Sequence, residues 1–512
     1  MFNVSTICIM IAIVVYLALM IYIGARFSRR NENTNDFYLG GRKLGPLVTA
    51  MSAEASDMSS YLLMGLPGLA YLSGLADVTW TAIGLAVGTY LNWLIVAKRL
   101  RRYSSVTNSI TLPDFFSNRF RDRKHILESI AALVIIIFFV PYTASGFAAC
   151  GKLFNSLFGV DYIWVMIISA VIIAIYTMLG GFMAASFTDL IQSIVMTVAI
   201  ASVLIFGVVS AGGWGAVVEN ASRLPGYLSM NATYVEDTAS SAPYGFITII
   251  STMAWGLGYF GMPHILLRFM AIKDEKKLTL SRRIASVWVV IAMGIAILIG
   301  IIGRTLSGIG VIDSLSGSAT ENVIIRIAYV ISQHGALAAL LAGIILAGIL
   351  AATMSTADSQ LLAASSSVTE NLIKGLFGRK LTTKQSMLIA RLTVVIIAVI
   401  AVFIARDPNS NVFTIVSFAW AGFGAAFGPL VLFSLFWKRT TKWGALAGMV
   451  SGGVMIFVWK FLVRPIGGAW NIYELLPAFI VSCVFIVVVS LLTKKPEQEI
   501  IDEFDSIGRT AA

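Results

Sequence analysis

The sequence predicts an all-α protein that crosses a membrane many times. Of its 512 residues, 58% are hydrophobic and only 12% are charged, which is about half the charged fraction of an ordinary soluble domain. Apolar runs of about 20 residues recur along the chain, and a run of that length crosses a bilayer as a helix. Two of these runs are interrupted by carboxylates, hydroxyls or glycines, a pattern typical of transporters with inverted repeats.

Thirteen apolar segments follow one another, near residues 4–25, 46–71, 77–97, 127–149, 161–185, 190–211, 244–266, 284–304, 334–365, 386–405, 412–436, 443–463 and 472–493. With the N-terminus outside and the C-terminus inside, 29 of the 37 Lys and Arg residues fall on the inner side. This asymmetry predicts the orientation, because positively charged loops stay in the cytoplasm. The net charge of +11 therefore reflects topology and does not indicate nucleic-acid binding.

The segments predict one membrane domain with a repeated core. Residues 4–25 carry no signal-peptide pattern and are expected to remain as an extra first helix. Residues 46–211 and 244–436 are expected to form two inverted repeats of five helices each. Two extra helices follow within residues 443–493, and residues 494–512 are expected to form a solvated cytoplasmic tail.

The second segment contains the stretch SAEASDMSSYLLMGLPG, residues 52–68. An ionised side chain at mid-bilayer costs about 2.5–3.5 kcal/mol on insertion scales, so Asp57 predicts a compensating partner such as a bound cation. The alternative is that Asp57 only caps the N-terminus of a half-helix. Glu54 is weaker evidence for a bound cation, because a carboxylate in a broken helix could simply face an aqueous vestibule.

The seventh segment contains WGLGYFGMP, residues 255–263, whose glycines and proline weaken a helix. This break lies five segments after the first, so the two breaks occupy matching positions in the two repeats. Such a match predicts a binding site near the midplane, whereas unrelated kinks are the alternative. Trp255 and Tyr259, with Tyr142 of the fourth segment, would contact a small apolar ring there while freed backbone groups hold a zwitterion. Aromatic residues in membrane helices are otherwise usually packing or interface anchors.

A third group of polar residues lies in AATMSTADSQLLAASSS, residues 351–367. Ala352, Ser355, Thr356 and Ser359 share one helical face. Hydroxyls on this face and carbonyls of an interrupted helix would form a compact oxygen cage, which suits Na⁺ better than Ca²⁺ because Ca²⁺ takes more oxygens and more carboxylate. The alternative is that the hydroxyls only bond to their own helix or to a neighbouring one.

Asp189, in the stretch SFTDL, falls in a predicted inner loop that has no basic residue. One interpretation is a solvated loop aspartate, and the other is a cation relay toward the cytoplasm.

The sequence gives little support for a metalloprotease, an ATP-driven pump or another enzyme. The three cysteines and three histidines are dispersed, without the spacing of a metal site or of a disulfide framework. The sequence contains neither HExxH nor GxxxxGK[ST], which disfavours metalloprotease chemistry and ATP-driven pumping. No paired catalytic residues indicate an enzyme. A channel or a solute sensor is the remaining class, although a sensor would need a signalling domain.

Seven stretches resemble the sodium/solute symporter family: LGGRKLGP (39–46), SAEASDMSSYLLMGLPG (52–68), MLGGFMAASFTD (178–189), WGLGYFGMPHILLRFMA (255–271), ILAATMST (349–356), AWAGFGAAFGP (419–429) and WKRTTKWGALAGM (437–449). The resemblance covers nearly the whole chain, and the stretches around Asp57 and Trp255 are similar to the branch that transports proline. It implies a leucine-transporter-type fold with a 5+5 inverted-repeat core and thirteen transmembrane helices.

The same resemblance implies import of L-proline coupled to Na⁺ across the bacterial cell membrane. Another small solute, such as another amino acid, a vitamin or a sugar, is the alternative cargo. Proline, Na⁺ and the lipid bilayer are the implied partners. Neither an organic cofactor nor an obligate protein partner is implied.

Roles for individual residues also follow only from the resemblance. The implied Na⁺ ligands are three carbonyls and two hydroxyls, those of Ala55, Met58, Ala352, Ser355 and Thr356. Asp57 and Ser59 would be needed for Na⁺ dependence, Asp189 would lie on the inner Na⁺ route, and Arg42 would affect coupling. The implied proline site comprises Ser59, Tyr142, Trp255, Tyr259 and Pro263. The chain departs from the family pattern at Glu54 and Ser60, where small residues are usual, and this is expected to alter cation affinity.

Overall fold

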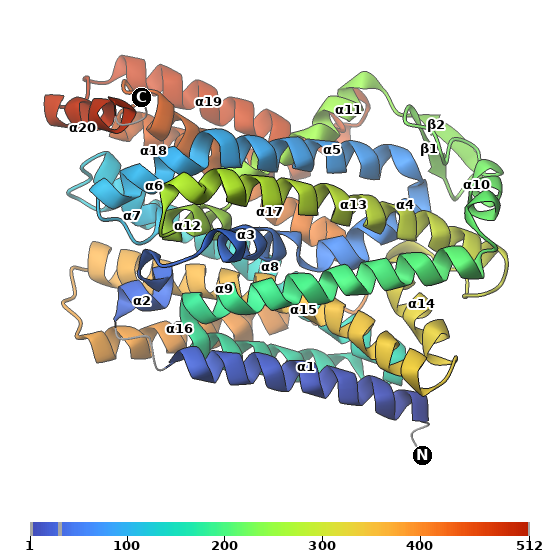
Figure 1. Cartoon of the computed structure of the whole chain (residues 1–512). Helices are drawn as coiled ribbons and strands as arrows, with labels where there is room; N and C mark the ends of the chain where they lie inside the picture. The colour runs from blue at the N-terminus through green and yellow to red at the C-terminus, as the bar shows by residue number, and fades with distance from the viewer. Residues whose placement is uncertain (1–3, 29–32, 510–512) are drawn as a thin grey trace.

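The computed structural model describes residues 4–28 and 33–509, and it is built almost entirely of long helices that run side by side (Figure 1). The helices are α1 (Val4–Ser28), α2 (Thr34–Leu39), α3 (Pro46–Ser60), α4 (Leu66–Ser73), α5 (Leu75–Leu91), α6 (Ala97–Val106), α7 (Leu112–Arg119), α8 (Ile126–Phe158), α9 (Tyr162–Ser210), α10 (Trp214–Ser222), α11 (Phe246–Met253), α12 (Pro263–Ala271), α13 (Leu278–Gly308), α14 (Val323–Ser332), α15 (Ala336–Ser366), α16 (Thr383–Ile404), α17 (Val412–Phe436), α18 (Lys442–Val458), α19 (Leu475–Leu492) and α20 (Gln498–Arg509). A two-stranded antiparallel hairpin, β1 (Ala232–Val235) and β2 (Ser240–Pro243), lies in the loop that follows α10.

Ten helical stretches within the described residues are long and apolar enough to cross a membrane. One of them, α9, has 49 residues and would measure about 74 Å if straight, more than twice the bilayer core of about 30 Å. Its backbone leaves the helical region at Gly181 (φ 66°, ψ −171°), so α9 consists of two helices. The second and seventh segments are broken into pieces too short to be counted. The number of thirteen membrane crossings stays a prediction.

Both predicted breaks are confirmed. In the second segment, α3 is interrupted at Ser59, which adopts φ 48° and ψ −167°, a conformation uncommon for any residue other than glycine. The Ser59 hydroxyl accepts a hydrogen bond from the Tyr61 N–H (3.2 Å), and the helix then continues into α4. In the seventh segment, α11 ends in a 3₁₀ turn at 254–260, and Pro263 occupies the first turn of α12, where its missing N–H costs nothing.

The glycines of the seventh segment allow backbones to approach closely. A Cβ atom on Gly256 would lie 2.1 Å from the Gly84 carbonyl oxygen of α5. A Cβ on Gly258 would lie 2.0 Å from Nε1 of Trp420, which donates a hydrogen bond to the Trp255 carbonyl (2.7 Å). The irregular turn is therefore pressed between α5 and α17.

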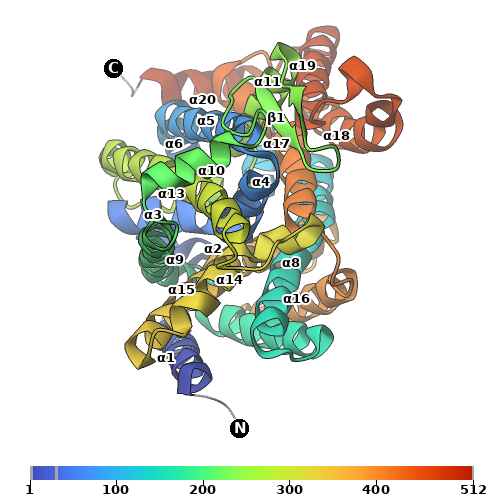
Figure 2. The same cartoon turned by 90° about the vertical axis from the view of Figure 1, so that its right-hand side faces the viewer.

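The breaks lie in the interior of the bundle, and the extra helices lie at its edges. Figure 2 shows α1 beside α15 at one edge and α18 and α19 at the opposite edge. The helices that carry the breaks, α3, α4 and α12, lie between them (Figures 1 and 2).

The tail differs from the expected solvated segment. Ile500, Phe504 and Ile507 of α20 are buried, because their i, i+4, i+7 spacing places them on one helical face. The guanidinium groups of Arg99 and Arg119 lie over the Phe504 ring, 4.7 and 5.1 Å from its centroid. The prediction for the tail is therefore wrong over α20, and residues 510–512 lie outside the described residues.

Candidate functional site

The two breaks and the neighbouring helices enclose a small cavity of about 250 Å³. It is lined by Asp57, Met58, Tyr61, Leu85, Tyr142, Trp255, Val416 and Trp420. The Trp255 ring lies 5.6 Å from the Tyr61 ring and 6.4 Å from the Trp420 ring, both in stacked orientation. The largely apolar walls of this aromatic cavity suit a small ring.

Asp57 supplies the only formal charge that lines the aromatic cavity within the described part of the chain. Its Oδ2 accepts a hydrogen bond from the Tyr259 hydroxyl (2.5 Å), whereas its Oδ1 is buried without a partner among the described residues. No backbone N–H group of the described residues donates a hydrogen bond to the Asp57 carboxylate, so Asp57 does not cap a helix. Asp57 therefore presents a free carboxylate oxygen that can balance a positive charge in the cavity.

Four of the five predicted Na⁺ ligands lie together where α3 meets α15. The Ser355 hydroxyl lies 2.8 Å from the carbonyl oxygen of Ala55 and 3.2 Å from that of Ala352, and the Thr356 hydroxyl also lies 3.2 Å from the Ala352 oxygen. The fifth, Met58, is buried one turn along α3 and lines the aromatic cavity. This set contains only neutral oxygens, which suits a hard monovalent cation.

The predicted cargo residues do not all line the cavity. Tyr142 and Trp255 do so, whereas Tyr259 contacts it through its bond to Asp57. Pro263 is buried at the start of α12 and is not among the lining residues. The sequence analysis missed Tyr61 and Trp420, because their role becomes visible only when the second, seventh and eleventh segments are brought together.

Asp189 is fully buried in the second half of α9, so the interpretation as a solvated loop aspartate is wrong. It accepts hydrogen bonds from the Ser52 hydroxyl (2.6 Å) and from the Arg268 guanidinium (3.1 Å). Arg268 also donates to the Ser359 hydroxyl (2.6 Å). Arg268 is buried in α12, and these bonds, called the inner network below, tie α3, α9, α12 and α15 together.

Glu54 is buried as well, which contradicts its position facing a vestibule. Its Oε1 accepts hydrogen bonds from the indole N–H of Trp93 (3.0 Å) and from the Thr89 hydroxyl (3.2 Å).

Arg42 joins the segment before α3 to α12, to α6 and to the loop that follows α6. Its guanidinium donates to the carbonyl oxygens of Met270 (2.7 Å), Ser104 (2.9 Å) and Ser109 (2.7 Å). Burial and the nearby Arg101 charge lower the pKa of Arg42 to about 10. The guanidinium thus remains charged at neutral pH and holds these three backbone segments together.

A buried ion pair closes the opposite end. Lys152 of α8 donates to the Glu321 carboxylate (2.7 Å) and to the Ser410 carbonyl (2.7 Å). Glu321 also accepts bonds from the backbone N–H groups of Val412 (3.3 Å) and Phe413 (3.1 Å). The Phe413 ring lies 5.5 Å from the Trp255 ring, so Phe413 connects this ion pair, called the outer pair below, to the wall of the aromatic cavity. The sequence analysis missed it because both charges are isolated in the chain.

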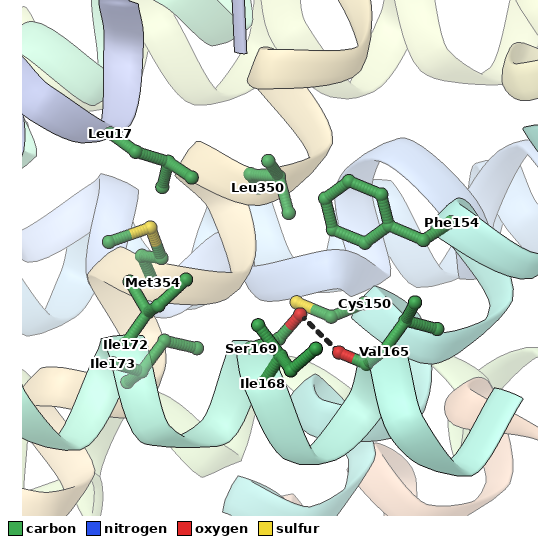
Figure 3. Close-up of a pocket in the computed structure, with 10 residues that line it drawn as sticks. All are labelled: Leu17, Cys150, Phe154, Val165, Ile168, Ser169, Ile172, Ile173, Leu350 and Met354. Carbon is green, nitrogen blue, oxygen red and sulfur yellow. Dashed lines mark hydrogen bonds between the residues drawn. The ribbon is translucent and has the colours of Figure 1, made fainter. Parts of the chain in front are cut away.

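A second, apolar cavity of about 460 Å³ lies between α1, α8, α9 and α15 (Figure 3). Its polar lining residue Ser169 already donates its hydroxyl to the Val165 carbonyl (2.8 Å). It has no free group with which to hold an ion or a zwitterion, so it is not the functional site.

Comparisons with known proteins identify the family to which the chain is similar over most of its length. The model of the "Sodium:solute symporter family" matches residues 37–452. The chain is 42% identical over 503 residues to a "Sodium/proline symporter" of Haemophilus influenzae, covering 97% of each chain. It is 41% identical over 495 residues to one of Staphylococcus aureus, covering 95% of this chain and 93% of that one.

Two solved transporters have the same architecture. A Na⁺-coupled sialic acid symporter in a substrate-bound outward-open state has a TM-score of 0.78 at 17% identity, covering 96% of this chain and 99% of that one. Mhp1, a nucleobase-cation-symport-1 family transporter, has a TM-score of 0.55 at 14% identity, covering 91% and 98%. Both have the leucine-transporter-type fold, so the predicted fold class is confirmed.

Proposed function

Because the chain belongs to the sodium:solute symporter family, we propose that it imports L-proline together with Na⁺ by alternating access. The observation that carries this proposal is the aromatic cavity, in which a free Asp57 oxygen faces small apolar walls. A cyclic amino acid offers a compact ring to those walls and an ammonium group to that oxygen. Relatives that are 41–42% identical are named for the same cargo.

Na⁺ would couple to the cargo through the break in α3. A cation held by Ala55, Met58 and Ala352 carbonyls with Ser355 and Thr356 hydroxyls would join α3 to α15. The same stretch of α3 carries Asp57 and Met58, which line the aromatic cavity. Binding of Na⁺ would therefore order the cargo site. The membrane potential would add about 2.3 kcal/mol per charge per 100 mV to the Na⁺ gradient.

The structure is closed at both ends of the site. The outer pair Lys152–Glu321 and the inner network of Arg268 and Asp189 are both formed, and Asp57 is only 5% exposed. Alternating access would break the outer pair for entry and the inner network for release, and Asp189 would then lie on the inner route of Na⁺.

We also assign the topology as a proposal. The two repeats would be residues 46–211 and 244–436, with the N-terminus outside and the C-terminus in the cytoplasm. The location of 29 of the 37 basic residues on the inner side supports this orientation.

Uptake of radiolabelled proline by proteoliposomes tests the function. Concentrative uptake is expected with an inward Na⁺ gradient and is expected to disappear when K⁺ or choline replaces Na⁺. Uptake that is equal in all three salts would contradict the proposal, and counterflow with competing solutes would reveal another preferred cargo.

Ser355→Ala is expected to raise the Na⁺ concentration for half-maximal uptake by about tenfold or more, because it removes one of five cation ligands. Ser365→Ala is the matched control: Ser365 is buried in the same helix and its hydroxyl donates to the Ala390 carbonyl (2.8 Å), as that of Ser355 does to Ala55 (2.8 Å), but Ser365 is not one of the proposed Na⁺ ligands. Initial rates of proline uptake, measured over a range of Na⁺ concentrations, give the Na⁺ requirement of each variant. An identical Na⁺ requirement in the two variants would argue against the ligand role of Ser355.

A further inference from the structure

A small polar cavity shares one lining residue, Tyr142, with the aromatic cavity, and its empty space, open solvent included, is about 180 Å³. Its walls are largely hydroxyl and amide groups, including those of Ser60, Thr143, Thr356 and Gln360. None of the described residues that line it carries a formal charge at neutral pH. The proposed function above leaves this space without a role.

Two groups in this polar cavity lack partners. The Gln360 carboxamide accepts a hydrogen bond from the Thr143 hydroxyl through Oε1 (3.0 Å), and this bond orients its amide nitrogen. Gln360 Nε2 and the Ser60 hydroxyl are both buried without a hydrogen-bond partner in the described part of the chain. Because buried donors are almost always satisfied in native proteins, two unsatisfied donors in one cavity point to a ligand that accepts hydrogen bonds.

The backbone and the expected cation favour a negative ligand here. The break at Ser59 starts a new helical run. The first N–H of this run, that of Tyr61, already donates to the Ser59 hydroxyl (3.2 Å), but the start of a helix also carries a partial positive charge. Thr356, whose hydroxyl belongs to the proposed Na⁺ site, also lines the cavity. A bound cation would therefore add positive charge at its wall.

Resting on the proposed function, we propose that the polar cavity binds the carboxylate of the transported amino acid, with Gln360 Nε2 and the Ser60 hydroxyl as its donors. The ring and the ammonium group then occupy the aromatic cavity next to Asp57. The zwitterion spans the two cavities across Tyr142. This arrangement couples cargo to cation directly, because the carboxylate lies on the same side of Tyr142 as the Na⁺ ligand Thr356.

The test compares proline with L-prolinamide, in which an uncharged amide replaces the carboxylate. Competition of each compound against radiolabelled proline in proteoliposomes gives their apparent affinities. Ser60→Ala and Gln360→Glu are each expected to lower the apparent affinity for proline by about tenfold or more. Ser60→Ala loses a hydrogen bond to the charged carboxylate, and Gln360→Glu replaces one by repulsion between two negative charges. The apparent affinity for prolinamide is expected to change by less than threefold in both variants. The ratio of the affinities for proline and prolinamide should therefore fall. Ser434→Ala is the control, because it removes an equally buried and unpaired hydroxyl outside this cavity.

The outcomes separate the two proposals. Absence of Na⁺-dependent proline uptake in the wild type would overturn the proposed function, and the carboxylate site with it. Wild-type uptake combined with equal losses for proline and prolinamide, or with no loss, would overturn the carboxylate site alone. Gln360→Asn keeps the amide but shortens it, so it decides the question if Gln360→Glu fails to fold. Gln360→Asn is expected to lower the apparent affinity for proline more than that for prolinamide.

Discussion

Replacing Asp57 with alanine is expected to raise the Na⁺ concentration needed for half-maximal proline uptake by about a hundredfold. Its free Oδ1 is the negative charge that faces the aromatic cavity. The attraction between opposite unit charges amounts to about 4 kcal/mol at 4 Å for an effective dielectric constant of 20, and loss of about two thirds of it corresponds to about a hundredfold in affinity. Asp57→Asn is expected to behave similarly, because it keeps the shape and removes the charge.

Glu54→Gln is the matched control for this experiment. Glu54 is a buried carboxylate of the same helix with one unpartnered oxygen, Oε2, like Asp57, but it does not line the aromatic cavity. Its Oε1 accepts bonds from Trp93 and Thr89, and glutamine can keep both. Its Na⁺ requirement is expected to stay within about threefold of the wild type. An unchanged Na⁺ requirement in Asp57→Ala, or an equal rise in Glu54→Gln, would contradict a specific role for Asp57.

Glu321→Gln is expected to lower the maximal rate of proline uptake by about a hundredfold while leaving proline binding nearly unchanged. The variant leaves Lys152 buried without a charged partner, and loss of one partner of a buried ion pair costs about 3–5 kcal/mol. The closed outer end would become the unstable state, so the transporter would bind its cargo but rarely complete the cycle. Binding of proline to purified protein and the uptake rate in proteoliposomes measure the two effects separately.

The double variant Lys152→Met with Glu321→Gln distinguishes an ion pair from general damage. It removes both charges, so no unpaired charge remains buried, and the uptake rate is expected to recover at least tenfold relative to Glu321→Gln. A double variant as slow as the single one would argue against the outer pair as the cause, as would a parallel loss of proline binding.

The sequence was sufficient to predict the breaks because their cause is local. Glycines and Pro263 weaken a helix wherever they stand, and carboxylates such as Asp57 stand out in an apolar segment. The face shared by Ser355 and Thr356 was likewise predictable from helical spacing alone. All of these features depend on residues within about ten positions of one another.

Features that depend on contacts between distant segments were not predictable. Trp420 and Tyr61 reach the aromatic cavity only through packing, and the outer pair joins two charges that are 169 positions apart. Asp189 was placed in a loop because the turn of the chain occurs at Gly181, inside an apolar run where hydropathy shows no change. Phe504 was assigned to a solvated tail because its partners, such as Arg119, lie in an inner loop far away in sequence.

The most direct test of the central claim is a calorimetric titration of the purified protein with proline, in Na⁺ and in K⁺ at equal ionic strength. If a cation between α3 and α15 organises the cargo cavity, Na⁺ should lower the dissociation constant of proline at least tenfold. Proline should then lower that of Na⁺ by the same factor, because coupling between two sites is reciprocal. Proline affinities that are equal in the two salts would contradict the account.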